Sequence, residues 1–286
     1  MYLGYNTWSM PTLPLSKAVE VIEEAGFDSL EIAVAEGWPS EIIKMGRGET
    51  AALISQLNNS RLVVSGLSGN QPILVPDKQW AENRERFQLS LELAANLSGD
   101  GKLRYVATTA GDLAEWNGSD DGVEEALVDR FGQLAEDARE RGALIHLEPH
   151  VGSIVRRPEM AASILKKVNS PSFRISLDIS HFIVQGDDEA EVVTQLKPWL
   201  GAVEVKDQRG LDPDYEWLIP GEGTQDYPIF LRALANAGYC GSVSAEISLA
   251  RQVPDDFDPI ATVEQTYQSL SAAFDVAGID RSKGKL

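Results

Sequence analysis

Acidic and imidazole side chains meet in two short segments of the sequence. "LIHLEPH", residues 144–150, places His146, Glu148 and His150 two residues apart, and "ISLDISH", residues 175–181, places Asp178 three residues before His181. The chain has three histidines, and all of them lie in these two segments. Buried carboxylates are costly unless they are paired or bind a metal. The two segments therefore predict a polar site.

Two further acids lie near the ends of apolar runs, Glu204 in "GAVEVKD" and Glu246 in "GSVSAEI". Carboxylates with a little imidazole suit a hard divalent cation such as Mn²⁺ or Mg²⁺, with Zn²⁺, which prefers more nitrogen or sulfur, as the alternative. Paired acids can also move protons, and a metal lowers the barrier to removing a proton from a carbon beside its oxygen ligand. This is the chemistry of sugar isomerases and epimerases.

Eight short apolar runs predict the strands that position these acids, because each is partly β-branched and bounded by Gly, Asp, Ser or Pro. Segments of helical periodicity separate the runs, the clearest within residues 16–27, 80–97, 123–142 and 227–239, and a last one covers 258–278. Gly26, Gly142 and Gly238 suit helix C-caps. Eight such units in 286 residues predict one (β/α)8 TIM barrel domain over residues 1–286.

A barrel of this kind builds its active site from the C-terminal ends of the strands. Glu148, Asp178, Glu204 and Glu246 would then share one rim. Strand alternation turns His146 to the same face as Glu148, and Lys206 to the same face as Glu204. An open doubly wound sheet is the structural alternative, but no G-x-G-x-x-G follows the first strand.

Composition excludes several classes of protein. The net charge of −19 argues against nucleic-acid binding, which depends on Lys and Arg. The single cysteine, Cys240, excludes an internal disulfide and a cysteine-built metal site. No apolar run approaches the ~18 residues of a membrane span. With no visible signal peptide, the expected location is cytoplasmic.

A long segment between the last two strands interrupts the regular spacing. It covers about residues 207–227, lacks periodicity and contains "IPGEG", and we expect an ordered loop over the barrel mouth, with a solvated insertion as the alternative. Residues 280–286 are expected to form a frayed tail. Weaker site candidates are Asn6 and Trp8 after the first strand, where an aromatic could stack on a sugar, and Trp116 and Trp217, which could cover a substrate. Glu31 in the second strand is another, with a buried acid paired with a cation as the alternative.

The motifs "LEPH", "LDISH", "VEVKDQRG" and "PGEG", followed by "ALANAGYCGSVSAEIS", resemble those of the xylose-isomerase-like TIM barrel superfamily. The superfamily includes sugar-phosphate isomerases, ketose 3-epimerases, inosose dehydratases and apurinic endonucleases. The resemblance implies metal ligands at Glu148, Asp178 and Glu246, with the two glutamates as acid and base. It also implies that His181 and Arg209 hold substrate oxygens.

The chain departs from the superfamily's motif at one ligand. Where an "H-V-K-D"-like motif supplies a histidine, this chain has Glu204. Four ionised carboxylates around one divalent cation would leave an excess negative charge. Lys206 or Arg209 could neutralise it, one carboxyl could keep a proton, or His181 or His150 could replace Glu204 as ligand.

The expected function is a metal-dependent isomerase or epimerase of a small sugar, keto-sugar or polyol, working through a metal-stabilised enediolate. Its metal ligands would be Glu148, Asp178, Glu204 and Glu246, and its substrate-binding residues His146, His150, His181, Lys206, Arg209, Asn6 and Trp8. The alternatives are a lyase acting on an inosose- or 3-keto-glycoside-like substrate, and a non-catalytic sugar-binding barrel. An apurinic endonuclease is disfavoured by the few histidines and the negative charge.

Overall fold

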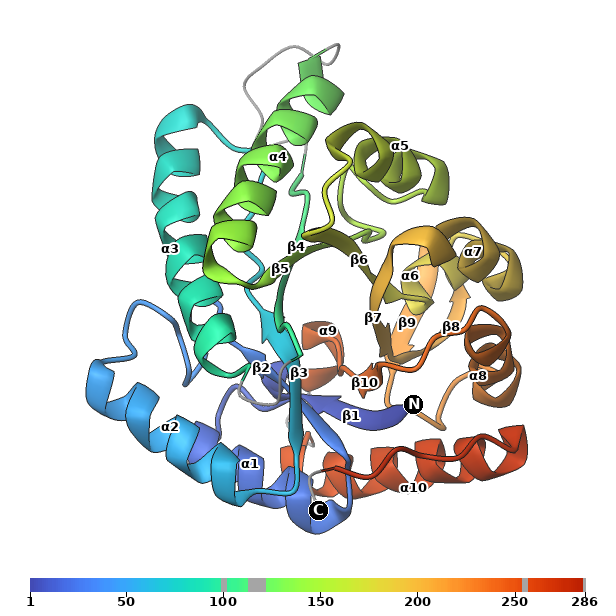
Figure 1. The fold of residues 1–286 in the computed structure, drawn as a ribbon. Coiled ribbons are helices and arrows are strands. Elements are labelled where there is room, and N and C mark those ends of the chain that lie inside the picture. Colours follow the sequence, from blue (N-terminus) through green and yellow to red (C-terminus); the bar gives the residue numbers. More distant parts are fainter. Residues whose placement is uncertain (99–101, 113–121, 254–256, 285–286) are drawn as a thin grey trace.

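Eight parallel strands close into a barrel in a computed structural model that describes residues 1–98, 102–112, 122–253 and 257–284. The order around the barrel is β1-β10-β7-β6-β5-β4-β3-β2 (Figure 1). The strands are β1 (Tyr2–Asn6), β2 (Ser29–Ala33), β3 (Val63–Ser68), β4 (Tyr105–Thr109), β5 (Leu144–Glu148), β6 (Phe173–Asp178), β7 (Leu200–Val205) and β10 (Ser242–Ala245). The predicted (β/α)8 TIM barrel is confirmed.

Helices surround the barrel and connect consecutive strands (Figure 1). The longer ones are α1 (Leu15–Ala25), α2 (Arg47–Asn59), α3 (Asp77–Asn96), α4 (Val123–Arg141), α5 (Pro158–Val168), α7 (Glu189–Leu196), α8 (Tyr227–Asn236) and α10 (Pro259–Ala277). Short turns of helix follow three of the strands: η1 (Thr7–Ser9), α6 (Ser180–Ile183) and α9 (Leu249–Gln252); η4 (Lys197–Trp199) precedes β7. None of the described helices is long and apolar enough to cross a bilayer.

The ends of the helices follow from local sequence. Gly26 and Gly142 adopt the left-handed conformation at the C-caps of α1 and α4, where a residue without Cβ is favoured. Asp226 and Asp258 accept backbone N–H groups at the N-caps of α8 and α10, and each is followed by a proline in the first turn. These signals place the helices so that their apolar faces pack on the barrel.

The segment after β7, where the sequence predicts a loop over the barrel mouth, contains an antiparallel hairpin of β8 (Asp207–Leu211) and β9 (Asp214–Leu218). Asp207 fixes the rest of the segment. Its carboxylate accepts hydrogen bonds from the backbone N–H groups of Gly221 and Gly223 at 2.9 and 3.0 Å, and of Gln225 at 3.1 Å. The "PGEG" motif therefore folds around an acid at the end of the "VKD" motif.

The expected frayed tail is wrong for residues 280–284. Arg281 pairs with Asp28 at 2.8 Å and donates to the carbonyl of Gly26 at 2.8 Å, and the backbone N–H of Ser282 donates to the carbonyl of Met1. The guanidinium of Arg281 holds the tail in place, because it binds the buried carboxylate of Asp28 and the carbonyl of Gly26 at the C-terminus of α1. Residues 285 and 286 and Trp116, a proposed aromatic cover, lie outside the described residues.

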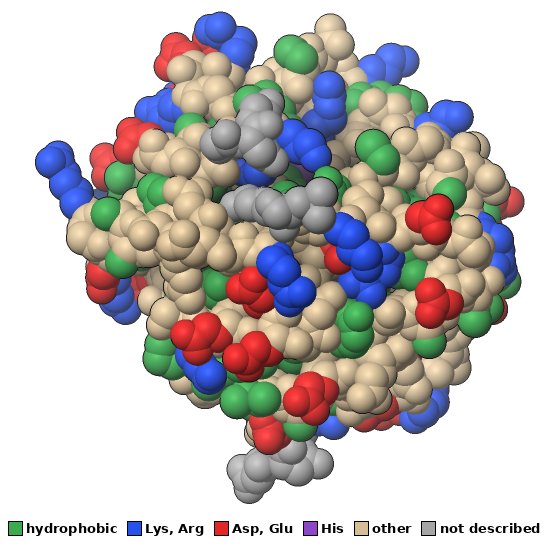
Figure 2. All heavy atoms as spheres, turned by 60° about the horizontal axis from the view of Figure 1, so that its bottom comes forward, with side chains coloured by type: hydrophobic (Ala, Val, Ile, Leu, Met, Phe, Trp, Pro, Cys, Tyr) green, Lys and Arg blue, Asp and Glu red, His purple; other side chains and the backbone are tan. Residues whose placement is uncertain are grey.

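The surface shown in Figure 2 carries intermixed acidic and basic side chains. Over the described residues of this face, Lys and Arg side chains lie beside Asp and Glu and form no broad basic patch.

Candidate active site

Four acids meet at the C-terminal rim of the barrel, as the sequence predicts. Glu148 and Asp178 are the last residues of β5 and β6, Glu204 is next to last in β7, and Glu246 directly follows β10. Asp178 and Glu204 are partners in neighbouring strands. All four side chains are buried, with Glu148 and Glu246 keeping 5% and 6% exposure. The two glutamates face each other across the mouth, because β6 and β7 separate their strands.

Asp178 is oriented by the turn that follows it. Its Oδ1 accepts hydrogen bonds from the backbone N–H and the hydroxyl of Ser180, at 3.0 and 2.5 Å. This arrangement holds one carboxylate oxygen at the start of α6 and leaves Oδ2 directed to the centre of the rim.

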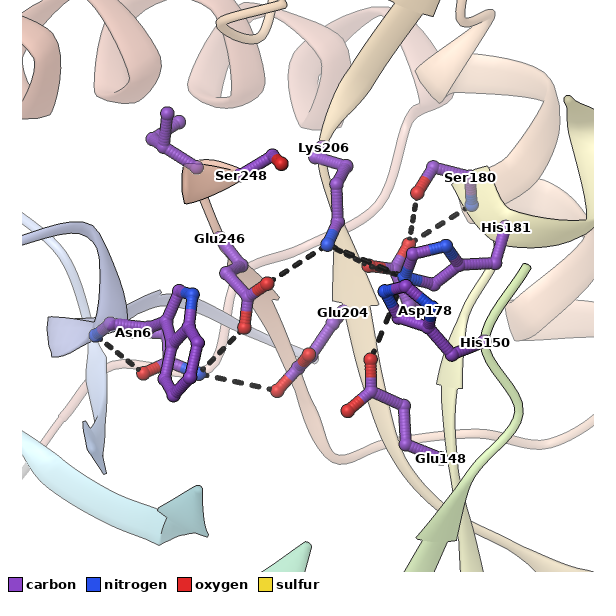
Figure 3. A network of polar contacts seen from close by, with 12 residues as sticks. Asn6, Glu148, His150, Asp178, Ser180, His181, Glu204, Lys206, Glu246 and Ser248 are labelled. Atoms are coloured by element: carbon purple, nitrogen blue, oxygen red, sulfur yellow. Dashed lines mark hydrogen bonds and ion pairs between the residues drawn. The ribbon is translucent and has the colours of Figure 1, made fainter. Parts of the chain in front are cut away.

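Lys206 lies at the centre of the cluster (Figure 3). Its ammonium group is 2.9 Å from Oδ2 of Asp178 and 2.8 Å from Oε1 of Glu246. The side chain is only 3% exposed, and Trp217 of β9 covers it, with the ammonium 5.4 Å from the ring centroid. Burial alone would lower the pKa of Lys206, but the charges of Asp178, Glu246 and Glu148 outweigh it and raise the pKa well above its usual value. Lys206 is therefore a resident cation of the site.

Glu204 turns away from this cation and toward the barrel interior. Its Oε1 accepts a hydrogen bond from the amide of Asn6 at 3.3 Å, and its carboxyl group contacts that of Glu31. If both acids were ionised, Oε2 of Glu204 would have no hydrogen-bond partner. Burial, and then the charge of Glu31, raise the pKa of Glu204 well above its usual value. A proton on Glu204 would join the two acids by a hydrogen bond.

Among the described residues, the hydrogen-bond donors to Glu31 are hydroxyl groups and not the side chain of a cation. Glu31 accepts hydrogen bonds from the hydroxyls of Ser68 at 2.8 Å and Tyr105 at 2.7 Å. Hydroxyl donors and a shared proton can satisfy a buried acid without a cation, which is the reason that the alternative of a cation partner was wrong. Asn6 links this inner layer to the rim, because its amide also donates to Ser68 at 2.7 Å and to Glu246 at 3.5 Å.

The pKa values of the two glutamates at the mouth are raised. For Glu148 the main cause is burial, to which the charge of Glu246 adds. For Glu246 burial is again the main cause, and Lys206 opposes it. A carboxyl with a raised pKa is a better base at neutral pH than an ordinary glutamate, so both side chains are suited to proton transfer.

His150 and His181 also reach the rim and are neutral there. Their rings lie 3.8 Å apart, and Nε2 of His181 is 3.7 Å from Glu148 and 3.6 Å from Asp178 (Figure 3). Burial lowers the pKa of His150 to about 4 and that of His181 well below its usual value. Neutral imidazoles can donate to or accept from a substrate hydroxyl, or ligate a metal.

Two of the predicted substrate-binding residues lie outside this cluster. His146 points into the barrel, as alternation requires, but it stacks on Tyr105 at 4.2 Å below the rim. Arg209 is exposed on β8, where it pairs with Glu216 at 2.7 Å and donates to the carbonyl of Glu222. A hairpin in place of an irregular loop turns Arg209 outward, so the structure does not bring it to the acids.

The acids fit a divalent cation by type and by spacing. Glu148, Asp178 and His181 offer ligand atoms within 4.8 Å of one another, and so do Asp178, Glu204 and Glu246. The expected set of four carboxylates is thus two overlapping groups that share Asp178. An ion that binds Asp178 and Glu246 would compete with the Lys206 ammonium for both carboxylates.

Comparison with known proteins agrees with this fold. The sequence profile of the family described as xylose isomerase-like TIM barrel matches residues 19–271, and the chain belongs to this family. An uncharacterised protein of Mycobacterium leprae is 26% identical over 274 residues, covering 86% of this chain and 88% of that protein.

Two solved structures show the same fold at low identity. A 3-keto-D-glucoside 4-epimerase from E. coli superposes with a TM-score of 0.76 at 18% identity, covering 96% of this chain and 99% of that one. The IOLI protein, solved with a zinc atom, gives a TM-score of 0.77 at 22% identity, covering 97% and 98%.

Proposed function

We propose that the protein is an isomerase or epimerase of a small sugar, keto-sugar or polyol. The observation that carries this proposal is the placement of Glu148 and Glu246 on opposite sides of the mouth, with Lys206 and Asp178 between them. Two bases on opposite sides of one binding site can remove a carbon-bound proton from one face and return a proton to the other. The 3-keto-D-glucoside 4-epimerase of the same fold supports the choice of substrate class.

Proton transfer follows from the charges of the rim. One of the two glutamates, ionised, removes the proton from the carbon next to a carbonyl, while the other, protonated, supplies a proton to the other face. Negative charge then develops on the substrate oxygens, where the ammonium of Lys206 stabilises it. His150 and His181, neutral and side by side, orient the neighbouring hydroxyls.

We also propose that Asp178, Glu246 and Glu148 hold a divalent cation, with Glu204 or His181 completing its ligands. Mn²⁺ and Mg²⁺ suit the oxygen donors best, and Zn²⁺ is supported by the zinc atom in the IOLI structure. When bound, such a cation polarises the carbonyl of the substrate and lowers the barrier to proton removal. Proton transfer and the orientation of the substrate hydroxyls are carried out by the side chains.

The test is solvent exchange. The protein is incubated in D₂O with a panel of keto-sugars and either Mn²⁺ or Mg²⁺, and deuterium at carbon is followed by NMR. The expected result is deuterium in one sugar together with its epimer or isomer, and loss of their interconversion in Glu148→Gln. Glu216→Gln is a matched control, because this glutamate is 55% exposed on the hairpin and should leave exchange unchanged.

Other outcomes separate the alternatives. Deuterium uptake with loss of water or of an aglycone would identify a lyase. No uptake from any sugar, with sugar binding retained, would contradict the proposal and leave a non-catalytic binding barrel.

A further inference from the structure

A groove adjoins the acidic rim on the side of β1 and β3. It has a volume of about 890 Å³ and lies between the segments after β1, β2 and β3 and the first turns of α3. Trp8, Trp38, Asn70 and Gln71 are part of its lining. The volume falls within the ~300–1,000 Å³ typical of ligand pockets.

Two residues that touch the acids connect this groove to the rim. Asn6, whose amide contacts Glu204 and Glu246, also accepts the backbone N–H of Trp8 at 2.9 Å. Ser68 bonds Asn6 at 2.7 Å and stands two residues before Asn70. The groove thus begins where the ends of β1 and β3 leave the acidic cluster.

The lining has the chemistry of a carbohydrate subsite. The indoles of Trp8 and Trp38 stack at 3.8 Å, and both remain partly exposed. The side-chain oxygens of Asn70 and Gln71 are buried and have no hydrogen-bond partner, and Gln71 as a whole is only 5% exposed. A buried acceptor without a partner is costly, and a small rotation of either side chain into the groove would let a ligand hydroxyl satisfy it. Aromatic rings offer the apolar faces on which sugar rings stack.

Charge in the groove favours a neutral occupant. Its lining has three acids, Glu36, Glu82 and Glu85, and two bases, Lys78 and Arg86. Arg86 is paired with Glu36 at 3.1 Å. A phosphate group would meet a slight excess of negative charge.

We propose that this groove is a subsite for the non-reacting ring of a glycoside, so that the substrate is an extended saccharide rather than a free monosaccharide. This inference rests on the proposed function, since the reacting ring would lie on Glu148 and Glu246. The second ring stacks on the tryptophan pair, and its hydroxyls donate to Asn70 and Gln71.

Binding without turnover tests the subsite separately from the reaction. Cellobiose, maltose, sucrose and D-glucose are titrated by NMR into the wild-type protein, Trp38→Ala and Gln71→Leu. At least one disaccharide should bind, and Trp38→Ala should weaken it about tenfold, the equivalent of about 1.4 kcal/mol. Gln71→Leu should weaken it about threefold to tenfold, because it removes one hydrogen-bond acceptor.

Titration with glucose distinguishes binding of a ring at the rim from binding of a ring in the groove. Its affinity should change by less than about twofold in both variants, since one ring can occupy the rim alone. Gln265→Leu is the control for the Gln71 substitution, because Gln265 lies on α10 and bonds Glu222 outside the groove. Gln71→Leu should also fold normally, since it removes an acceptor that has no partner.

Two results would overturn the subsite: no binding of any disaccharide to the wild-type protein, or equal binding by the wild type and both variants. Absence of deuterium exchange with all keto-sugars would contradict the proposed reaction instead. A protein that exchanges deuterium but shows no effect of Trp38→Ala keeps its proposed function and loses only the subsite.

Discussion

Replacement of Lys206 by methionine removes the resident cation while keeping most of its volume. The ammonium makes two contacts, at 2.9 Å to Asp178 and 2.8 Å to Glu246. At an effective dielectric constant of about 20, each contact contributes roughly 6 kcal/mol of Coulomb attraction. Desolvation of the buried charges offsets much of this, and loss of one partner from a buried pair costs about 3–5 kcal/mol. We expect Lys206→Met to lower the free energy of unfolding by that amount in the presence of EDTA.

Divalent cations should recover much of this loss. With the ammonium gone, Asp178 and Glu246 are free to bind Mn²⁺ or Mg²⁺, and an ion at 100 times its dissociation constant stabilises the folded state by about 2.7 kcal/mol. Urea unfolding with EDTA and with each metal measures both effects. The metal should stabilise the variant more than the wild-type protein.

A matched control makes the same Lys→Met substitution at a surface ion pair, outside the acidic rim. Lys17 bonds Glu20 at 3.2 Å, and the two side chains are 48% and 54% exposed, so Lys17→Met should cost less than about 1 kcal/mol and give no metal effect. Equal stability of Lys206→Met and the wild type in EDTA, or no added response to metal, would show that Lys206 is not the cation that balances Asp178 and Glu246.

Three further perturbations test the surroundings of the site. Burial raises the pKa of Glu204 well above 4.5, so the folded state keeps a proton that the unfolded chain releases, and this group's stabilisation is lost as pH rises above about 4.5. Urea unfolding from pH 5 to 8 should therefore show a shallower decline for Glu204→Gln, by up to about 1.4 kcal/mol per pH unit, and parallel curves would contradict a proton on Glu204. Gly201→Ala should cost about 1–3 kcal/mol in urea unfolding, because a Cβ there meets the ring of His146 at 2.6 Å. Gly132→Ala, with nothing within 4 Å and a helical position, should instead stabilise the protein by about 0.5–1 kcal/mol, and similar effects of both substitutions would refute the packing argument. Asp207→Asn should speed proteolytic cleavage within residues 208–225, because the carboxylate accepts the N–H groups of Gly221, Gly223 and Gln225, and unchanged cleavage would show that Asp207 does not hold the loop.

The sequence predicts the barrel because its signals are local. Short apolar runs, helical periodicity and glycine caps repeat along the chain, and Gly26 and Gly142 lie at the helix ends that they indicate. The common rim of Glu148, Asp178, Glu204 and Glu246 then follows from the parallel strands alone. Strand alternation also places Lys206 on the inner side.

Which side chains of the rim contact one another depends on the closed barrel, and the spacing of residues in the sequence does not reveal it. Glu31 and Glu204 are 173 residues apart in the sequence, and only the closed barrel brings them into contact. The hairpin that turns Arg209 outward depends on pairing with β9. Trp38 and Gln71 gave no signal, because a loop aromatic and a loop amide are common; the neighbouring rim residues Asn6 and Trp8 were the clue to that side of the mouth.

In the proposed reaction, Glu148 and Glu246 act on opposite faces of one carbon. The direct measurement is deuterium exchange into each of the two epimers, or isomers, by Glu148→Gln and by Glu246→Gln, once the reacting sugar is found. Each variant should lose interconversion and still exchange the proton of only one epimer, and the two variants should exchange different ones. Interconversion at the wild-type rate in either variant, or exchange of both epimers by both variants, would contradict the account.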